Sequence, residues 1–175
     1  MAMYISMLRG VNVGGKKAEM AALAKMFEDI GATNVETYIQ SGNVVFETEQ
    51  GKRSIGAVIE KAFAAKFGFA TTAIIRTGRD LRRIVDSMPF SGVDTDRLHV
   101  TFLSEPPASF QDAEMDRVKK GEEAFSTAGT EIYIYCPYGY GRTKLNNGFI
   151  ERKLNVAATT RNWKTVNALL SMARG

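Results

Sequence analysis

Apolar residues follow two different spacings along the first 78 positions of the chain. Continuous or alternating apolar runs predict strands at residues 3–8, 35–40, 43–46 and 71–76. Apolar residues three and four positions apart predict helices at residues 20–30 and 55–67, each followed by a glycine that can end a helix. Ser41-Gly42 separates two of these strands and predicts a hairpin turn. The order of strand, helix, hairpin, helix and strand is that of the ferredoxin-like split βαβ unit.

The second half of the chain repeats this order of elements, although its sequence does not repeat that of the first half. Predicted strands cover residues 98–103 and 131–136, and predicted helices cover residues 81–88, 143–154 and two stretches that begin near Phe110 and at Trp163. Pro89 ends the first of these helices, and the second strand belongs to a hairpin that turns near Ala128-Gly129.

These patterns together predict an α+β protein. We expect two ferredoxin-like (split βαβ) subdomains with antiparallel sheets, plus a linking helix and a C-terminal helix. The predicted first subdomain covers residues 1–78, the linking helix and loop cover 79–96, and the second subdomain with the C-terminal helix covers 97–175. A chain of 175 residues has room for two small subdomains that share a core.

Composition narrows the class of protein. With 45% hydrophobic and 24% charged residues, the chain has the balance of a globular protein. No apolar run approaches the roughly 20 residues that span a bilayer, and the N-terminus lacks a basic leader, so we expect neither a membrane contact nor a signal peptide. Cys136 and His99 are each the only residue of their kind, which excludes an internal disulfide and a Cys/His zinc cluster and favours the cytoplasm. We expect no metal and no cofactor.

The formal net charge of +4 conceals an asymmetry along the chain. From Pro137 onward one acid, Glu151, accompanies seven cations, which are Arg142, Lys144, Arg152, Lys153, Arg161, Lys164 and Arg174. The residues from Pro137 onward therefore have a net charge of +6. The residues before Pro137 have a net charge of −2, which gives the total of +4. A basic end on a slightly acidic body suits phosphates or an acidic partner, although a solvated helix face is the simpler explanation of the charge alone.

A glycine-rich loop, Arg9-Gly10-Val11-Asn12-Val13-Gly14-Gly15-Lys16-Lys17, joins the first predicted strand to the first predicted helix. From Gly10 to Lys16 it has the G-x-x-x-x-G-K spacing of a P-loop. We reject a P-loop nucleotide hydrolase because Lys17 stands where Ser or Thr would hold Mg²⁺, and no later strand ends in the required aspartate. Two interpretations remain: a backbone nest that binds an anion, or a tight turn that needs glycine. The candidate contacts in this loop are Arg9, Asn12, Gly14, Gly15 and Lys16.

Two further segments supply candidate polar contacts. Those at the predicted hairpin are Gln40, Ser41 and Asn43, for which selection by turn geometry is the simpler explanation. Those near the C-terminus are Arg161, Asn162 and the only tryptophan, Trp163, with Lys144 as a further counter-charge. In the alternative interpretation, Asn162 or the threonines before it cap the last helix and Trp163 is a buried anchor.

Tyrosines are concentrated around the second predicted hairpin. Tyr133 and Tyr135 lie two positions apart and so share one face of the sheet, where paired aromatic residues can stack on bases. Packing between the subdomains is the favoured alternative for this pair. Tyr138, Tyr140 and Arg142 follow at once and combine aromatic rings with a cation.

Four segments resemble the bacterial domain of unknown function 1697 family. They are Leu8-Arg9-Gly10-Val11-Asn12-Val13-Gly14-Gly15, Thr37-Tyr38-Ile39-Gln40-Ser41-Gly42-Asn43-Val44-Val45-Phe46, Pro89-Phe90 and Thr159-Thr160-Arg161-Asn162-Trp163-Lys164-Thr165-Val166. The resemblance covers nearly the whole chain and implies two ferredoxin-like subdomains. It implies no catalytic role. One departure is Thr143, where a serine is expected before Lys144; the hydroxyl is retained.

Three classes of function are compatible with these residues. The first is binding of a phosphate-bearing ligand, a nucleotide or single-stranded nucleic acid, through the glycine-rich loop and the C-terminal cluster, with a steep dependence on salt. The second is an enzyme for a small anionic substrate, assisted by Lys16 or Lys144; no catalytic triad or carboxylate pair supports it. The third is a protein-interaction module. Lys16→Ala separates the first two, since it weakens affinity in a binder and turnover in an enzyme. The sequence does not predict an oligomeric state.

Overall fold

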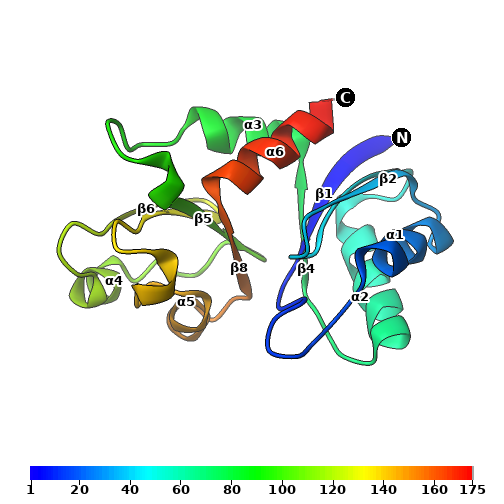
Figure 1. Ribbon diagram of the computed structural model, residues 1–175, viewed down its shortest axis with the longest axis horizontal. Coiled ribbons are helices and arrows are strands. Elements are labelled where there is room, and N and C mark those ends of the chain that lie inside the picture. Colours follow the sequence, from blue (N-terminus) through cyan, green and yellow to red (C-terminus); the bar gives the residue numbers. More distant parts are fainter. Residues whose placement is uncertain (175) are drawn as a thin grey trace. The chain divides into compact units, whose positions relative to one another are not determined.

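The computed structural model describes residues 1–174 and contains two four-stranded antiparallel sheets with helices (Figure 1). The strands are β1 Ala2–Leu8, β2 Thr33–Tyr38, β3 Asn43–Thr48, β4 Ala73–Thr77, β5 Leu98–Leu103, β6 Ala124–Ala128, β7 Glu131–Tyr135 and β8 Ala158–Asn162. The α-helices are α1 Met20–Asp29, α2 Lys52–Phe67, α3 Gly78–Asp86, α4 Asp112–Val118, α5 Asn147–Leu154 and α6 Trp163–Arg174. Short 3₁₀ turns cover Thr95–Arg97 and Tyr140–Arg142. None of the helices in residues 1–174 combines the length and the apolar character that a bilayer crossing requires.

The first sheet has the strand order β2-β3-β1-β4, and α1 and α2 cover one of its faces. Alternate residues of the strands point toward these helices, so that Tyr4 and Leu8 of β1 share a core with Phe46 of β3. Phe27 of α1 meets Phe46 edge to face at a centroid distance of 5.0 Å. The helices exist because their apolar residues recur every three or four positions and can cover this face.

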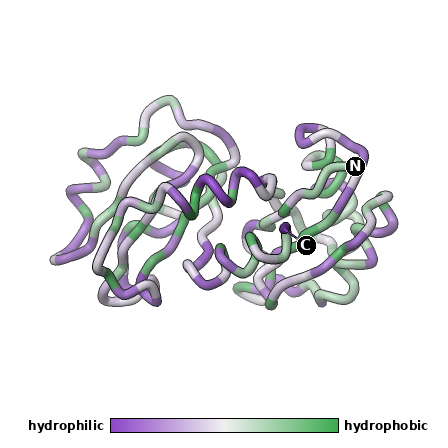
Figure 2. Tube along the Cα trace, turned by 90° about the horizontal axis from the view of Figure 1, so that it is seen from above, coloured by the Kyte–Doolittle hydropathy of each residue, from purple (hydrophilic) through white to green (hydrophobic). Residues whose placement is uncertain are grey.

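The second sheet has the strand order β6-β7-β5-β8, with α4 and α5 against one face. Its core includes Leu103, Ile132, Ile134 and Phe149. Each sheet therefore has the split βαβ order of two crossing connections and one hairpin, and the predicted pair of ferredoxin-like subdomains is confirmed. In Figure 2 hydrophobic and hydrophilic segments alternate along the Cα trace, as expected for a chain whose elements each have one buried face.

By their internal contacts the residues form two compact units. The first unit is Met1–Arg82 together with the chain from Leu169, and the second is Arg83–Ala168. Within the first unit, a Cβ added at Gly78 of α3 would lie 3.5 Å from the Cβ of Ala173 in α6, so these two helix ends are packed together. The predicted division into a first subdomain at residues 1–78, a linker at 79–96 and a second subdomain at 97–175 stays a prediction.

Three local predictions were wrong. The helix predicted from Thr143 begins only at Asn147, after a cap by the Asn146 side chain. The second predicted strand ends at Tyr38 rather than at residue 40, because Ile39 has a left-handed φ of 49° that no regular strand contains. The turn of the first hairpin therefore spans residues 39–42 and not Ser41-Gly42 alone. Strand β8, Ala158–Asn162, was not predicted as a strand, since its polar residues indicated only a helix cap. Its two threonines are β-branched and suit the sheet edge that β8 forms beside β5.

Candidate functional site

The glycine-rich loop closes as a tight turn. The Lys16 N–H donates to the Val13 carbonyl at 3.1 Å, and the Asn12 N–H donates to the Lys16 carbonyl at 2.7 Å. Gly14 and Gly15 lie between them with φ values of 57° and 81°, the pair of positive angles typical of a type I′ turn. Helix α1 begins only at Met20, so its N-terminus does not follow Lys16 directly. These angles favour the tight-turn interpretation of the glycines; we call residues 13–16 the glycine turn.

Asn12 connects the glycine turn to the turn of the first hairpin, residues 39–42, which we call the hairpin turn. Its side-chain amide donates to the carbonyls of Ala18 at 2.9 Å and Gln40 at 2.5 Å. Its side-chain oxygen accepts the Ala18 N–H at 2.8 Å. Asn12 has a φ of 60°, a conformation that asparagine tolerates better than most residues. Asn12 therefore holds the glycine-rich loop against the hairpin turn.

Close backbone packing reinforces this connection. The Leu8 N–H donates to the Gly42 carbonyl at 3.0 Å. A Cβ added at Gly42, whose φ is 82°, would lie 3.1 Å from the Cβ of Leu8 and 3.2 Å from that of Val11. Glycine at this position thus serves both the backbone angle and the close approach of the two segments.

Most of the predicted contacts in the hairpin turn serve the fold. Asn43 is fully buried, and its amide donates to the Tyr38 carbonyl and to the Ser41 hydroxyl at 3.1 and 2.8 Å. Arg9 lies half-buried at the base of the loop, and its carbonyl accepts the Thr71 hydroxyl at 2.8 Å. Gln40 is exposed.

Five residues on or directly beside these two turns have exposed side chains, and we call them the turn surface. It consists of Val13, Lys16, Lys17, Ile39 and Gln40. Val13 and Ile39 are 59% and 52% exposed, which is unusual for large aliphatic residues in the described chain. Neither lysine forms an ion pair with any residue between 1 and 174. The turn surface therefore offers uncompensated positive charge beside apolar side chains.

The C-terminal cluster spans the junction of β8 and α6. The Asn162 side chain accepts the Thr165 N–H at 2.9 Å, so the predicted helix cap is present. Arg161 is 8% exposed, and its guanidinium donates to the Thr159 hydroxyl at 2.7 Å and to the Thr160 carbonyl at 3.1 Å. Burial lowers the pKa of Arg161 to about 10. Trp163 is half-buried.

A polar network that sequence reasoning missed lies on the helix-covered face of the second sheet. The Thr160 hydroxyl lies 2.7 Å from the Thr101 hydroxyl and 2.6 Å from the Asn147 side-chain oxygen, and it accepts the Tyr140 hydroxyl at 3.1 Å. The His99 ring stacks on Tyr140 at a centroid distance of 4.9 Å. Burial lowers the pKa of His99 and raises that of Tyr140, so both are neutral at pH 7. The β5–β8 register places Thr101 opposite Thr160, which only the fold reveals.

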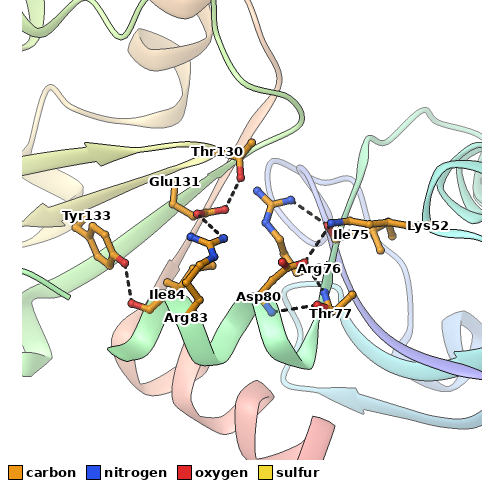
Figure 3. A network of polar contacts seen from close by, with 10 residues as sticks. All are labelled: Lys52, Ile75, Arg76, Thr77, Asp80, Arg83, Ile84, Thr130, Glu131 and Tyr133. Carbon is orange, nitrogen blue, oxygen red and sulfur yellow. Dashed lines mark hydrogen bonds and ion pairs between the residues drawn. The ribbon is translucent and has the colours of Figure 1, made fainter. Parts of the chain in front are cut away.

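The tyrosine pair on β7 contributes packing rather than an open stacking surface. Tyr133 is buried, and its hydroxyl donates to the Ile84 carbonyl of α3 at 2.7 Å (Figure 3). The ring of Tyr135 lies 6.5 Å from that of Phe90. Beside Tyr133, the buried carboxylate of Glu131 pairs with Arg83 at 3.3 Å.

The other end of α3 is fixed by a reciprocal cap in the first unit (Figure 3). The Asp80 carboxylate accepts the Thr77 N–H at 2.9 Å, and the Thr77 hydroxyl accepts the Asp80 N–H at 3.0 Å. Lys52 also contacts Asp80 at 3.1 Å. Partial burial acts to raise the pKa of Asp80, but these hydrogen bonds lower it below its ordinary value. The polar contacts of α3 therefore serve structure.

The predicted site residues thus fall into two groups. Those of the glycine-rich loop and the hairpin turn lie in the first unit and are joined by Asn12. Lys144, Arg161, Asn162 and Trp163 lie in the second unit. A single site made of both groups stays a prediction. Residues 1–174 contain no group of three or more His, Cys, Asp or Glu side chains placed to hold a metal ion.

The fold and these contacts define an α+β protein of two ferredoxin-like units. The chain belongs to the family described as "Protein of unknown function (DUF1697)", whose model matches residues 1–133. It is also similar to a solved structure of the conserved bacterial protein SP0830 from Streptococcus pneumoniae, with 23% identity and a TM-score of 0.79 over 100% of this chain and 99% of that chain. At this identity the likeness shows the fold alone. No curated protein matches the chain.

Proposed function

We propose that this protein binds a phosphate-bearing ligand, a nucleotide or single-stranded nucleic acid, at the turn surface. The observation that supports the proposal is the connection through Asn12, which holds the two turns together and leaves Lys16 and Lys17 exposed without an ion-pair partner in the described chain. An arrangement of fixed backbone and uncompensated cations favours an anionic ligand.

Each exposed side chain of the turn surface has a proposed role. Lys16 and Lys17 contact phosphate oxygens as point charges. The Gln40 amide hydrogen-bonds to sugar or base, and the exposed side chains of Val13 and Ile39 contact apolar faces of the ligand. Ile39 keeps a left-handed φ of 49°, a strained conformation for a β-branched residue, and such strain is found preferentially at functional sites.

The second unit holds its own candidate contacts for a phosphate-bearing ligand, apart from the turn surface. Lys144 is exposed and has no ion-pair partner among residues 1–174, and Arg161, Asn162 and Trp163 complete the set selected from the sequence. The single cysteine, Cys136, is unpaired, so we propose that the ligand is encountered in the reducing environment of the cytoplasm.

The test is the affinity of the full chain for a fluorescent single-stranded oligonucleotide and for mononucleotides, measured by anisotropy or competition at two salt concentrations. We expect the double variant Lys16→Ala/Lys17→Ala to bind about tenfold or more weakly. For the oligonucleotide, the slope of log affinity against log salt concentration should become shallower by about 1.4, because two phosphate contacts are lost. Lys61→Ala is the control, since Lys61 is also exposed and has no ion-pair partner in the described chain but lies on α2.

An equal loss of affinity in Lys61→Ala would indicate a general charge effect and remove the turn surface from the proposal. Absence of any saturable binding to either ligand class at low salt, with a folded wild type, would refute the function itself.

A further inference from the structure

A concave site lies wholly within the second unit and contains no residue of the turn surface. It is a cavity of about 370 Å³ lined by Lys120, Gly121, Glu123, Tyr138 and Arg142, which we call the Tyr138 pocket. This volume lies within the range of small-molecule sites.

The Tyr138 ring is fixed by backbone at one end and open elsewhere. Its hydroxyl accepts the Glu122 N–H at 3.1 Å. A Cβ added at Gly121 would overlap with this hydroxyl and lie 3.0 Å from Cζ, so the glycine permits a close approach that no other residue would. The side chain is nevertheless 48% exposed. The pocket therefore contains an aromatic surface that is held in place before any ligand binds.

Glu123 supplies a buried acceptor. The residue is 4% exposed, and its Oε1 accepts the Lys120 N–H at 2.8 Å. Its Oε2 receives no hydrogen bond from any residue between 1 and 174. This oxygen can be reached from the pocket that Glu123 lines, so a ligand there can donate a hydrogen bond to it in place of water. Burial, and to a smaller extent the charge of this carboxylate, raises the pKa of the Cys136 thiol to about 12.

The rim of the pocket is cationic. Lys120 and Arg142 are both exposed, and neither pairs with an acid in the described chain. The guanidinium of Arg142 can bind two oxygens of a phosphate at once. The pocket thus combines an anion-binding rim, a ring face and a buried hydrogen-bond acceptor.

From this combination we propose that the Tyr138 pocket binds a free nucleotide whose base carries an exocyclic amino group. The base stacks on Tyr138, its amino group donates to Glu123, and its phosphate contacts Lys120 and Arg142. This site goes beyond the function proposed for the turn surface and does not depend on it.

Cytidine and uridine monophosphates provide the sharpest comparison, because cytosine presents an amino donor at the position where uracil presents a carbonyl acceptor. We expect wild-type protein to bind the cytidine nucleotide about tenfold more tightly, the effect of one hydrogen bond to a charged group. In Glu123→Gln the amide oxygen continues to accept the Lys120 N–H and the amide nitrogen becomes a donor to the ligand. The preference should then shift toward uridine monophosphate.

Binding can be followed in ¹⁵N-labelled full-length protein, where glycine amide signals report on each site separately. We expect saturable shifts at Gly121 and Gly139 beside Tyr138, whereas shifts at Gly14 and Gly15 would report ligand at the turn surface. Arg142→Ala should weaken nucleotide binding about tenfold. The matched control is Arg152→Ala, an exposed arginine on α5 of the same unit.

Four results would overturn the proposal. Equal affinity of the wild type for the two nucleotides would remove the role of Glu123. If inorganic phosphate alone shifts the Gly121 signal as much as the nucleotide does, the pocket is an anion site and not a nucleotide site. If a zwitterionic amino acid gives larger shifts, the pocket binds amino acids instead. No shift at Gly121 at millimolar nucleotide, in a protein with native dispersion of signals, would exclude a ligand of this kind.

Discussion

Asn12 has a larger structural role than its place in an exposed loop would indicate. It makes three side-chain hydrogen bonds, to Ala18 twice and to Gln40, and it adopts a φ of 60°. Asn12→Ala removes the bonds and places alanine in an unfavourable conformation, whereas Asn12→Gly removes the bonds alone. We expect both variants to lose about 1–3 kcal/mol of unfolding free energy in urea titrations, with the alanine variant the less stable.

The same two variants test the proposed function. If the turn surface binds phosphate, both should weaken binding although neither removes a charge, because the lysines lose their fixed support. Unchanged stability in Asn12→Gly would contradict the structural role assigned to this side chain.

His99 makes stability depend on pH in the acid range. Burial lowers its pKa in the folded state below the ordinary value of about 6.5, which the unfolded chain retains. The unfolded state therefore binds the proton more tightly, and this contribution to stability is present above pH 6.5 and is lost as the pH falls toward the folded-state pKa. We expect the unfolding free energy of the wild type to fall more between pH 7.5 and 5.5 than that of His99→Gln.

Urea titrations of both proteins at the two pH values measure this difference. Parallel behaviour of the two proteins, or an NMR titration of the His99 ring with a midpoint at or above 6.5, would contradict it.

At the scale of elements, helix α3 depends on one hydroxyl at its C-terminal end. The Met88 N–H donates to Val85, so the Ile84 carbonyl relies on the buried Tyr133 hydroxyl. We expect Tyr133→Phe to reduce the unfolding free energy by about 1–2 kcal/mol, measured by urea denaturation. Tyr135→Phe is the control, because the Tyr135 hydroxyl has no hydrogen bond in the described chain and its removal should change stability little. Equal effects would show that the bond to Ile84 contributes nothing specific.

Sequence patterns predicted most of these elements because apolar periodicity is a local property. β5 was predicted with its observed bounds, and α6 with its first residue, Trp163. β8 was missed because its burial comes from pairing with β5, about 60 residues earlier, and not from an apolar run of its own.

The candidate site was predictable only in part for the same reason. The glycine-rich loop and the hairpin turn were each visible in the sequence, but the hydrogen bond from Asn12 to Gln40 that joins them crosses 28 positions. Tyr138 and Arg142 were visible as an aromatic and a basic residue, whereas Glu123 enters their pocket from another part of the chain. Chemistry that depends on tertiary contacts leaves no local pattern to read.

At the scale of the whole molecule, the two units differ in whether they are formed by one continuous stretch of chain or by two. The second unit is one continuous stretch, Arg83–Ala168, whereas the first takes its last portion from the chain beyond Leu169. Leu169 and Leu170 are both buried, so this portion carries apolar surface that needs the rest of the fold.

This division has a consequence for biosynthesis. The strands of the first unit are translated early, yet the segment from Leu169 that completes it is translated only after all of Arg83–Ala168. At elongation rates of about 5–20 residues per second, the nascent first unit spends seconds without this closing segment. The first unit is therefore begun before the second unit and completed only after it.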